Sequence, residues 1–227
     1  MNDEKPHYIG HRQRLKQRFL NGSFENFAEY ELLELLLFSA TPRKDVKPLA
    51  KKLLEKFGNL ANLINADKDK LLSIEGINDG VCLSFFIVRE LINRILKQKV
   101  VNQNIISSWG ALLDYLKSTM GGLRLEQFRV LFLNKKNILI SDEIMTIGTI
   151  DQAAVYPREI IKRALFHEAS VIILVHNHPS GSSQPSKADI ELTNKIVEAC
   201  NAVSIMVHDH VIISNKDYFS FKSNMFL

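Results

Sequence analysis

The stretch HNHPSGSSQPSKAD, residues 176–189, carries two histidines one residue apart and an aspartate after a loop of Pro, Ser and Gly. It follows VIILV, an apolar run typical of a buried strand. Because side chains alternate along a strand, His176 and His178 are expected on one side and Asn177 on the other. The loop turns into a helix whose first turn can return Asp189 to the strand end. Three such ligands and a fourth position for water predict a catalytic zinc site.

Each part of this motif also has a purely structural interpretation. Ser186 and Asp189 form a Ser-x-x-Asp pattern typical of a capping box at a helix start. The occurrence of both parts together favours metal binding, with ligand types that suit zinc. A second His-x-His, His208 and His210 in VHDHV, is compatible with a second ion. It is more typical of a strand with one buried and one exposed histidine, or of support for the first site.

The second half of the chain alternates strands and helices. The expected elements are a helix at 109–120, a hairpin of FRVLFLN and ILIS, a strand-like segment at 143–147, a helix begun by Pro157, the strand VIILV, a helix at 189–199, and the strands VSIMV and VIIS. This alternation predicts an α/β or α+β layer fold with one mixed sheet over residues 105–227.

The first half predicts a small helical bundle over residues 1–104. GHRQRLKQRFL is basic and amphipathic, EYELLELLLFSA is strongly apolar, and VKPLAKKLLEKFGNLANLINA repeats apolar residues at helical spacing. LLSIEGINDGVCLSFFIVRELINRIL indicates two helices joined by a tight turn at residues 76–80, which is either a phosphate-holding helix-hairpin-helix or a plain helical corner. The polar segment at 97–106 predicts a linker between the two domains.

Composition limits the class of protein. With 227 residues, 46% hydrophobic and 24% charged, the chain has ordinary globular composition. Its apolar runs fall short of the roughly 20 residues that cross a bilayer. The N-terminal residues show no secretory signal, so we expect a cytoplasmic protein without a membrane partner. Cys82 and Cys200 are expected to be buried apolar residues rather than a disulfide.

The net charge of +4 is unevenly distributed. Residues 1–104 hold 17 Lys and Arg against 13 Asp and Glu, whereas residues 105–227 hold 12 of each. The excess in the first half is compatible with weak DNA binding there, or with a solvated basic face.

HisAsnHisPro followed by ProSer-x-x-Asp resembles the JAMM signature of zinc-dependent MPN-domain isopeptidases. HNHPSG, with PREIIKRAL upstream and DHVIIS downstream, is more similar to the bacterial RadC family, UPF0758 type. HRQRLKQRFL, ELLELLLFSA and the turn after LLSIEGI extend this resemblance over nearly the whole chain. The resemblance implies an α+β protein with an N-terminal helix-hairpin-helix-like region and a C-terminal MPN domain of cytidine-deaminase-like type with a zinc site.

Carried over onto this chain, the resemblance makes His176, His178 and Asp189 the zinc ligands. It places Ser186 where the active-site serine of the family hydrogen-bonds the oxyanion or the bound water. The family also needs a proton-transferring Glu on an early strand of the domain. Glu126 fits that place best, and Glu143 is the alternative. Asn78 departs from the second Gly of typical hairpins, which weakens the implied DNA contact.

These features predict a zinc metallopeptidase or isopeptidase-like hydrolase that acts on an unidentified peptide or protein. Zinc lowers the pKa of its water from about 15.7 to about 7, and a nearby carboxylate can carry a proton to the leaving amine. The alternative is a DNA-associated accessory protein with a structural or vestigial metal. Three protein ligands favour catalysis, because a structural zinc is usually closed by four.

Overall fold

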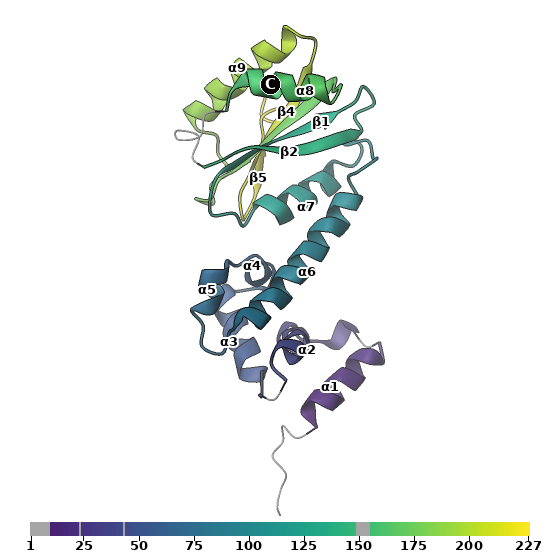
Figure 1. Cartoon of the computed structure of the whole chain (residues 1–227), viewed down its shortest axis with the longest axis vertical. Coiled ribbons are helices and arrows are strands. Elements are labelled where there is room, and N and C mark those ends of the chain that lie inside the picture. The colour runs from purple at the N-terminus through teal and green to yellow at the C-terminus, as the bar shows by residue number, and fades with distance from the viewer. Residues whose placement is uncertain (1–9, 23, 43, 149–154) are drawn as a thin grey trace, which may run out of the picture. The chain divides into compact units, whose positions relative to one another are not determined.

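The computed structural model describes residues 10–22, 24–42, 44–148 and 155–227. The chain forms two compact units that divide between Leu91 and Ile92, within the helix α6 (Asp79–Gln98) (Figure 1). This division lies earlier than the predicted boundary after residue 104. Val100 and Ile105 explain the difference, because both are fully buried in the apolar core of the second unit. The segment at 97–106 is therefore not a free linker.

The N-terminal unit is helical, as the periodicity of its apolar residues predicts. It contains α1 (His11–Leu20), a short 3₁₀ helix (Phe24–Asn26), α2 (Glu29–Ala40), α3 (Lys47–Phe57), α4 (Leu60–Ile64), α5 (Lys68–Leu72) and the first part of α6. Leu37, Leu53 and Phe85 are fully buried in its core. Glu34 is buried as well, and its Oε2 lies 2.7 Å from His11 Nε2, which ties α1 to α2.

Helices α5 and α6 are joined by the tight turn that the sequence predicts. Gly76 adopts a positive φ of 91° in the turn, a conformation that strongly favours glycine. Asn78 Oδ1 accepts a hydrogen bond from Val81 N at 3.0 Å, so the residue that departs from the usual glycine begins α6 as its cap. Lys68 Nζ lies 2.7 Å from Asp79 Oδ1 and links the two helices.

The C-terminal unit is an α+β domain built on one mixed sheet, which confirms the predicted fold class. Its elements are α7 (Trp109–Met120), β1 (Gln127–Leu133), β2 (Leu139–Ile147), α8 (Pro157–Phe166), β3 (Val171–Asn177), α9 (Lys187–Asn201), β4 (Met206–Ile213) and β5 (Tyr218–Ser220). The strand order is β2-β1-β3-β4-β5, with β3 and β4 parallel and the other pairs antiparallel.

Helices cover both faces of this sheet (Figure 1). Helix α7 packs against one face through Leu131 and Ile173, whereas α8 and α9 pack against the other through Val130 and Leu174. The central strand β3 is buried along its whole length, because β1 and β4 flank it and helices cover both sides. Its even-numbered residues face α9, so His176 ends the strand on the α9 side.

Two strands are longer than the sequence predicts. The segments expected at 138–141 and 143–147 form the single strand β2. Likewise, the polar residues His208 to His210 do not separate two strands but lie inside β4, which accommodates them with an irregularity in its pairing. The short strand β5 was not predicted. Cys82 and Cys200 are buried and unpaired, as expected. No helix in the described ranges is long and apolar enough to cross a bilayer.

Candidate metal centre

Three side chains meet where β3 ends and α9 begins. His176 Nε2 lies 3.0 Å from His178 Nε2 and 3.2 Å from Asp189 Oδ1, and His178 Nε2 lies 3.5 Å from Asp189 Oδ2. His176 and Asp189 are each 1% exposed, and His178 is partly exposed. Within the ranges that the structure describes, these three form the one group of His, Cys, Asp and Glu side chains arranged to hold a metal ion.

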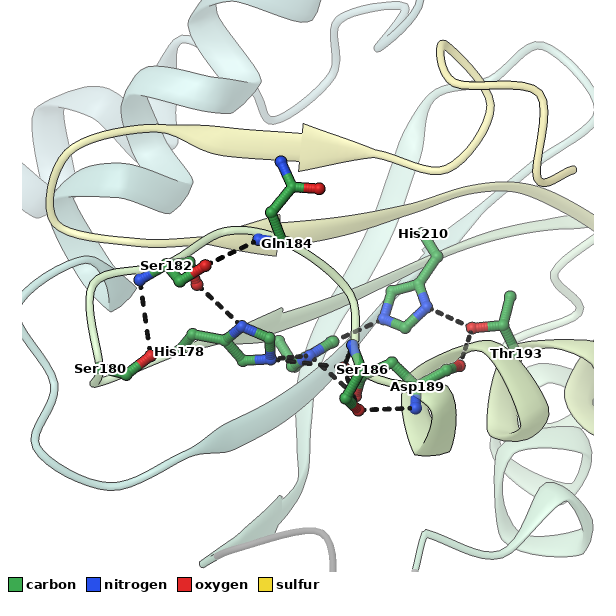
Figure 2. Close-up of polar contacts among 9 residues, drawn as sticks. His178, Ser180, Ser182, Gln184, Ser186, Asp189, Thr193 and His210 are labelled. Atoms are coloured by element: carbon green, nitrogen blue, oxygen red, sulfur yellow. Dashed lines mark hydrogen bonds and ion pairs between the residues drawn. The ribbon is translucent and has the colours of Figure 1, made fainter.

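The loop after β3 sets the orientation of His178 (Figure 2). His178 N donates to Ile213 O at 2.9 Å, and Gly181 N donates back to His178 O at 3.1 Å in a turn where Gly181 has a φ of 87°. His178 Nδ1 lies 2.9 Å from Ser182 O. Because a carbonyl oxygen only accepts, this contact requires a proton on Nδ1. It therefore leaves Nε2 of the neutral ring unprotonated and facing the cluster.

Ser186 and Asp189 form the capping box that the Ser-x-x-Asp pattern indicates (Figure 2). Ser186 Oγ accepts from Asp189 N at 3.1 Å, and Asp189 Oδ2 accepts from both the backbone N and the hydroxyl of Ser186 at 2.7 Å. Asp189 Oδ1 is buried and has no hydrogen bond of adequate geometry, although His176 Nε2 lies nearby. The Asp189 carboxylate thus caps α9 through Oδ2, and its Oδ1 lies near His176.

The electrostatics of the cluster favour a cation. Burial alone would raise the pKa of Asp189, but its interactions with the nearby His176 and His178 rings outweigh burial and hold this pKa well below its ordinary value. The nearby Asp189 carboxylate raises the pKa of His178 against the effect of burial, and the Ser182 carbonyl and the Glu126 charge act in the same direction. A buried carboxylate that stays ionised attracts positive charge to this point, as a proton or as a metal ion.

The arrangement fits a tetrahedral metal ion. In such a site, ligand atoms about 2.0–2.1 Å from zinc lie about 3.3 Å from one another. His176 Nε2 lies 3.0 Å from His178 Nε2 and 3.2 Å from Asp189 Oδ1, both close to this value, and ligand atoms of all three residues lie within 4.8 Å of one another. The buried Oδ1 of Asp189 has no other partner, and an orphaned buried carboxylate oxygen is costly unless something binds it. His176, His178 and Asp189 can therefore hold a metal ion.

Glu126 lies directly before β1, and its charge acts on His178. Phe128 pairs with His176 across β1 and β3, which brings the start of β1 to the same end of the sheet. Asn177 lies between His176 and His178 in the sequence, and its side chain hydrogen-bonds the backbone on both sides of Glu126. Its Oδ1 accepts from Gln127 N at 2.8 Å and its Nδ2 donates to Leu125 O at 3.1 Å. Asn177 thus holds both neighbours of Glu126, a role that the sequence analysis missed and that strand alternation alone does not reveal.

Glu143, the alternative proton carrier, is engaged elsewhere. It lies in β2 opposite Val130, which is two residues further along β1 than Phe128, the partner of His176. Arg163 Nε donates to Glu143 Oε2 at 2.6 Å, Arg163 Nη2 contacts Oε1, and His167 Nε2 lies 2.6 Å from Oε1. These contacts, with Arg163 the strongest, lower the pKa of Glu143 to about 2. The carboxylate ties β2 to α8.

Replacing Glu143 by Gln is expected to destabilise the fold in a pH-dependent way. The pKa falls from 4.5 to about 2 on folding, so the ionised group contributes its full stabilisation above about pH 4.5. That contribution is lost as the pH falls toward 2, and at neutral pH it is worth up to about 3 kcal/mol. Urea unfolding of Glu143→Gln at several pH values measures it, with the exposed Glu198→Gln as control. If Glu143→Gln lowered the free energy of unfolding equally at every pH, the stabilisation by Glu143 would not be ionic.

His208 and His210 lie in different surroundings. Val207 and Asp209 pair with consecutive residues of β3, so β4 has one extra residue between them. This irregularity places His208 and His210 on opposite faces of the sheet. The His208 ring lies 6.2 Å from that of Trp109 on α7. His210 is fully buried on the α9 side, with its Nε2 at 2.8 Å from His176 Nδ1. Burial, followed by the proximity of His176, keeps the pKa of His210 well below its ordinary value. The pair therefore does not form a second metal site.

Comparison with known proteins adds two family matches and a full-length relative. Residues 106–226 match the family described as RadC-like JAB domain, and residues 8–81 match the family described as UPF0758 N-terminal. The UPF0758 protein SPO0054 of Ruegeria pomeroyi is 45% identical over 223 residues, which cover 98% of this chain and 100% of that protein. The similarity thus extends over both compact units.

Proposed function

Because the chain belongs to the RadC-like JAB domain family, we propose that it is a zinc-dependent hydrolase that cleaves a peptide or isopeptide bond. The observation that carries the proposal is the convergence of two imidazole nitrogens and an orphaned carboxylate oxygen, with the charge of a second carboxylate, that of Glu126, acting on His178. Three protein ligands rather than four suit a catalytic ion, because a position is left for the reacting groups.

In this proposal the protein supplies three ligands and a proton carrier. His176 and His178 bind the ion through Nε2, and Asp189 binds it through Oδ1. When bound, zinc polarises the amide carbonyl and lowers the pKa of a water from about 15.7 to about 7. Glu126 accepts a proton from the attacking water and delivers it to the leaving nitrogen. The Asn177 contacts with Leu125 and Gln127 support this role, because they fix the backbone on both sides of the carboxylate.

Ser186 has a second role in the proposal besides capping α9. Its hydroxyl donates to Asp189 Oδ2, so it lies against the ligand carboxylate. Redirected to a substrate, the same hydroxyl donates to the oxyanion that forms when the carbonyl is attacked. The capping contact from Asp189 N to Ser186 Oγ persists in this arrangement, because the oxygen accepts there and does not need its proton.

Metal content and metal-dependent cleavage test the proposal together. Purified protein is expected to hold about one zinc per chain, since the described residues offer one suitable group of ligands. Hydrolysis of a panel of linear and isopeptide-linked substrates is expected to stop on chelation and to return when zinc is restored. Elemental analysis and mass spectrometry of the products measure both effects. Metal-free protein with full activity would contradict the proposal.

The alternative of a DNA-associated protein with a structural metal stays a prediction. It would place nucleic-acid binding in residues 1–104 and would leave the metal without a hydrolytic role. The turn between α5 and α6 does not favour it, because Asp79 puts a carboxylate in the first turn of α6, where a phosphate would approach the helix N-terminus. We therefore propose the metal centre of the C-terminal unit as the functional site.

A further inference from the structure

A chain of hydrogen bonds runs from the ligand His176 to the backbone of the ligand Asp189, and Figure 2 shows its part from His210 through Thr193 to Asp189. His176 Nδ1 lies 2.8 Å from His210 Nε2, and His210 Nδ1 lies 2.6 Å from Thr193 Oγ1. Thr193 Oγ1 in turn lies 2.6 Å from the backbone carbonyl oxygen of Asp189, one turn earlier in α9. His176, His210, Thr193 and Asp189 are all buried. We call these contacts the histidine relay.

The direction of every proton in the histidine relay follows from its last member. The carbonyl of Asp189 can only accept, so Thr193 must donate its single hydroxyl proton there. Thr193 Oγ1 can then only accept from the ring, which places a proton on His210 Nδ1. In neutral His210 the other nitrogen, Nε2, is consequently an acceptor, and His176 Nδ1 must donate to it. His176 Nε2 is left with its lone pair, facing His178 and Asp189.

The neutral state of His210 is favoured by its surroundings. Its ring stacks on Phe221, with centroids 4.7 Å apart, and meets Phe128 edge to face at 5.7 Å. No part of the residue is exposed to solvent. An imidazolium in this apolar pocket would lose its hydration without gaining a carboxylate on the ring nitrogens, because its two partners there are Thr193 and His176.

The two ligand histidines are therefore oriented by different means. His178 lies in the loop after β3, where the free carbonyl of Ser182 accepts from its Nδ1. His176 still belongs to β3, and its backbone neighbours pair with β1 on one side and β4 on the other. Main-chain carbonyls in such a ladder are already bonded, so a side chain must accept from His176 Nδ1. His210 in β4 provides that acceptor, and Thr193 in α9 fixes which nitrogen of His210 it is.

We propose that His210 and Thr193 are positioning residues that fix the Nδ1–H tautomer of His176 and so direct its Nε2 lone pair at the metal. The proposal deepens the proposed function and rests on it for the identity of the ion. Hydrogen-bond partners of ligand imidazoles set the tautomer and ring orientation, and their loss typically weakens metal binding 10- to 100-fold.

Thr193→Val and Thr193→Ser form the matched pair that tests the histidine relay. Val keeps the shape of Thr but lacks the hydroxyl, so His210 is free to carry its proton on Nε2 and to force the Nε2–H tautomer on His176. Ser keeps the hydroxyl and the relay. His210→Leu removes the acceptor altogether, whereas His210→Gln retains an oxygen that can accept from His176 Nδ1.

Two readouts are needed, the first of them independent of any metal. Nitrogen-15 NMR of the imidazole rings in metal-free protein, at a pH well above the raised pKa of His178, reports which nitrogen of His176 is protonated. Wild type and Thr193→Ser are expected to show the Nδ1–H form, and Thr193→Val and His210→Leu are expected to populate the Nε2–H form. Zinc affinity, measured by competition with a chelator, is expected to fall about 10- to 100-fold in the latter two and to recover in His210→Gln.

The outcomes separate the relay from the function on which it rests. An Nε2–H tautomer of His176 in the wild type, or an unchanged tautomer in Thr193→Val, would overturn the relay even if zinc binds. Equal zinc affinity in Thr193→Val and Thr193→Ser would overturn it too. A wild-type protein that shows the Nδ1–H tautomer but binds no zinc would refute the proposed function alone. Circular dichroism of each variant shows that differences in affinity do not arise from unfolding.

Discussion

Replacing Glu126 by Gln is expected to lower the rate of amide hydrolysis by about 10²–10⁴-fold while leaving zinc content and fold unchanged. Gln has the shape of Glu but cannot accept the proton of the attacking water. The zinc stays because the ligands proposed for it are His176, His178 and Asp189, and Glu126 is not among them. The measurement is kcat/KM on the best substrate of the panel, together with elemental analysis of the same preparation.

Glu143→Gln is the control for this experiment, because Glu143 is bound by Arg163 and His167 and ties β2 to α8. It is expected to keep its hydrolytic rate under conditions where it is folded. If Glu126→Gln were fully active and Glu143→Gln were inactive with zinc bound, Glu143 would be the proton carrier instead. Full activity of both would exclude the proposed mechanism and leave the metal with a structural role.

Removing a ligand is expected to have the largest effect on the metal itself. Asp189→Asn loses the negative charge that the two histidines share, and His176→Ala or His178→Ala loses an imidazole. Because two remaining ligands make an inadequate site, each variant is expected to lose most of its zinc. Elemental analysis after removal of loosely bound metal measures the loss.

Ser186→Ala serves as the matched control for Asp189→Asn. Ser186 contacts the Oδ2 atom of Asp189 rather than the orphaned Oδ1, so its loss is expected to fray the start of α9 without removing the ion. The rate of hydrolysis is expected to fall as well, because one oxyanion contact is lost. Stoichiometric zinc in a His176→Ala and His178→Ala double variant would show that these histidines are not the zinc ligands.

The proximity of the ligands could be predicted from the sequence because the whole motif is local. Strand alternation brings His176 and His178 to one side, and the capping pattern returns Asp189 to them within one loop. Their roles as metal ligands stay a prediction until metal content is measured. The helical nature of the first half was predictable for a similar reason, since the periodicity of its apolar residues lies within each helix.

Other parts of the site depend on pairing between distant segments. Asn177 contacts Gln127 across 50 residues, and His210 reaches His176 across 34. Strand register decides both contacts, and no short pattern encodes it. The sequence VHDHV likewise does not reveal the extra residue in β4, although this residue determines which of His208 and His210 faces His176. The choice between Glu126 and Glu143 also depends on contacts with distant segments. Glu143 meets Arg163 and His167, whereas the charge of Glu126 acts on His178.

The Asn177 contacts also determine where the chain tolerates a change in length. Because Asn177 holds Leu125 and Gln127 from the neighbouring strand, Glu126 is expected to keep its place before β1 when residues are added between Met120 and Leu125. One residue inserted inside β1 would instead shift its register against β3 and send the following side chains to the other face. Insertions and deletions among relatives are therefore expected before β1 and not within it.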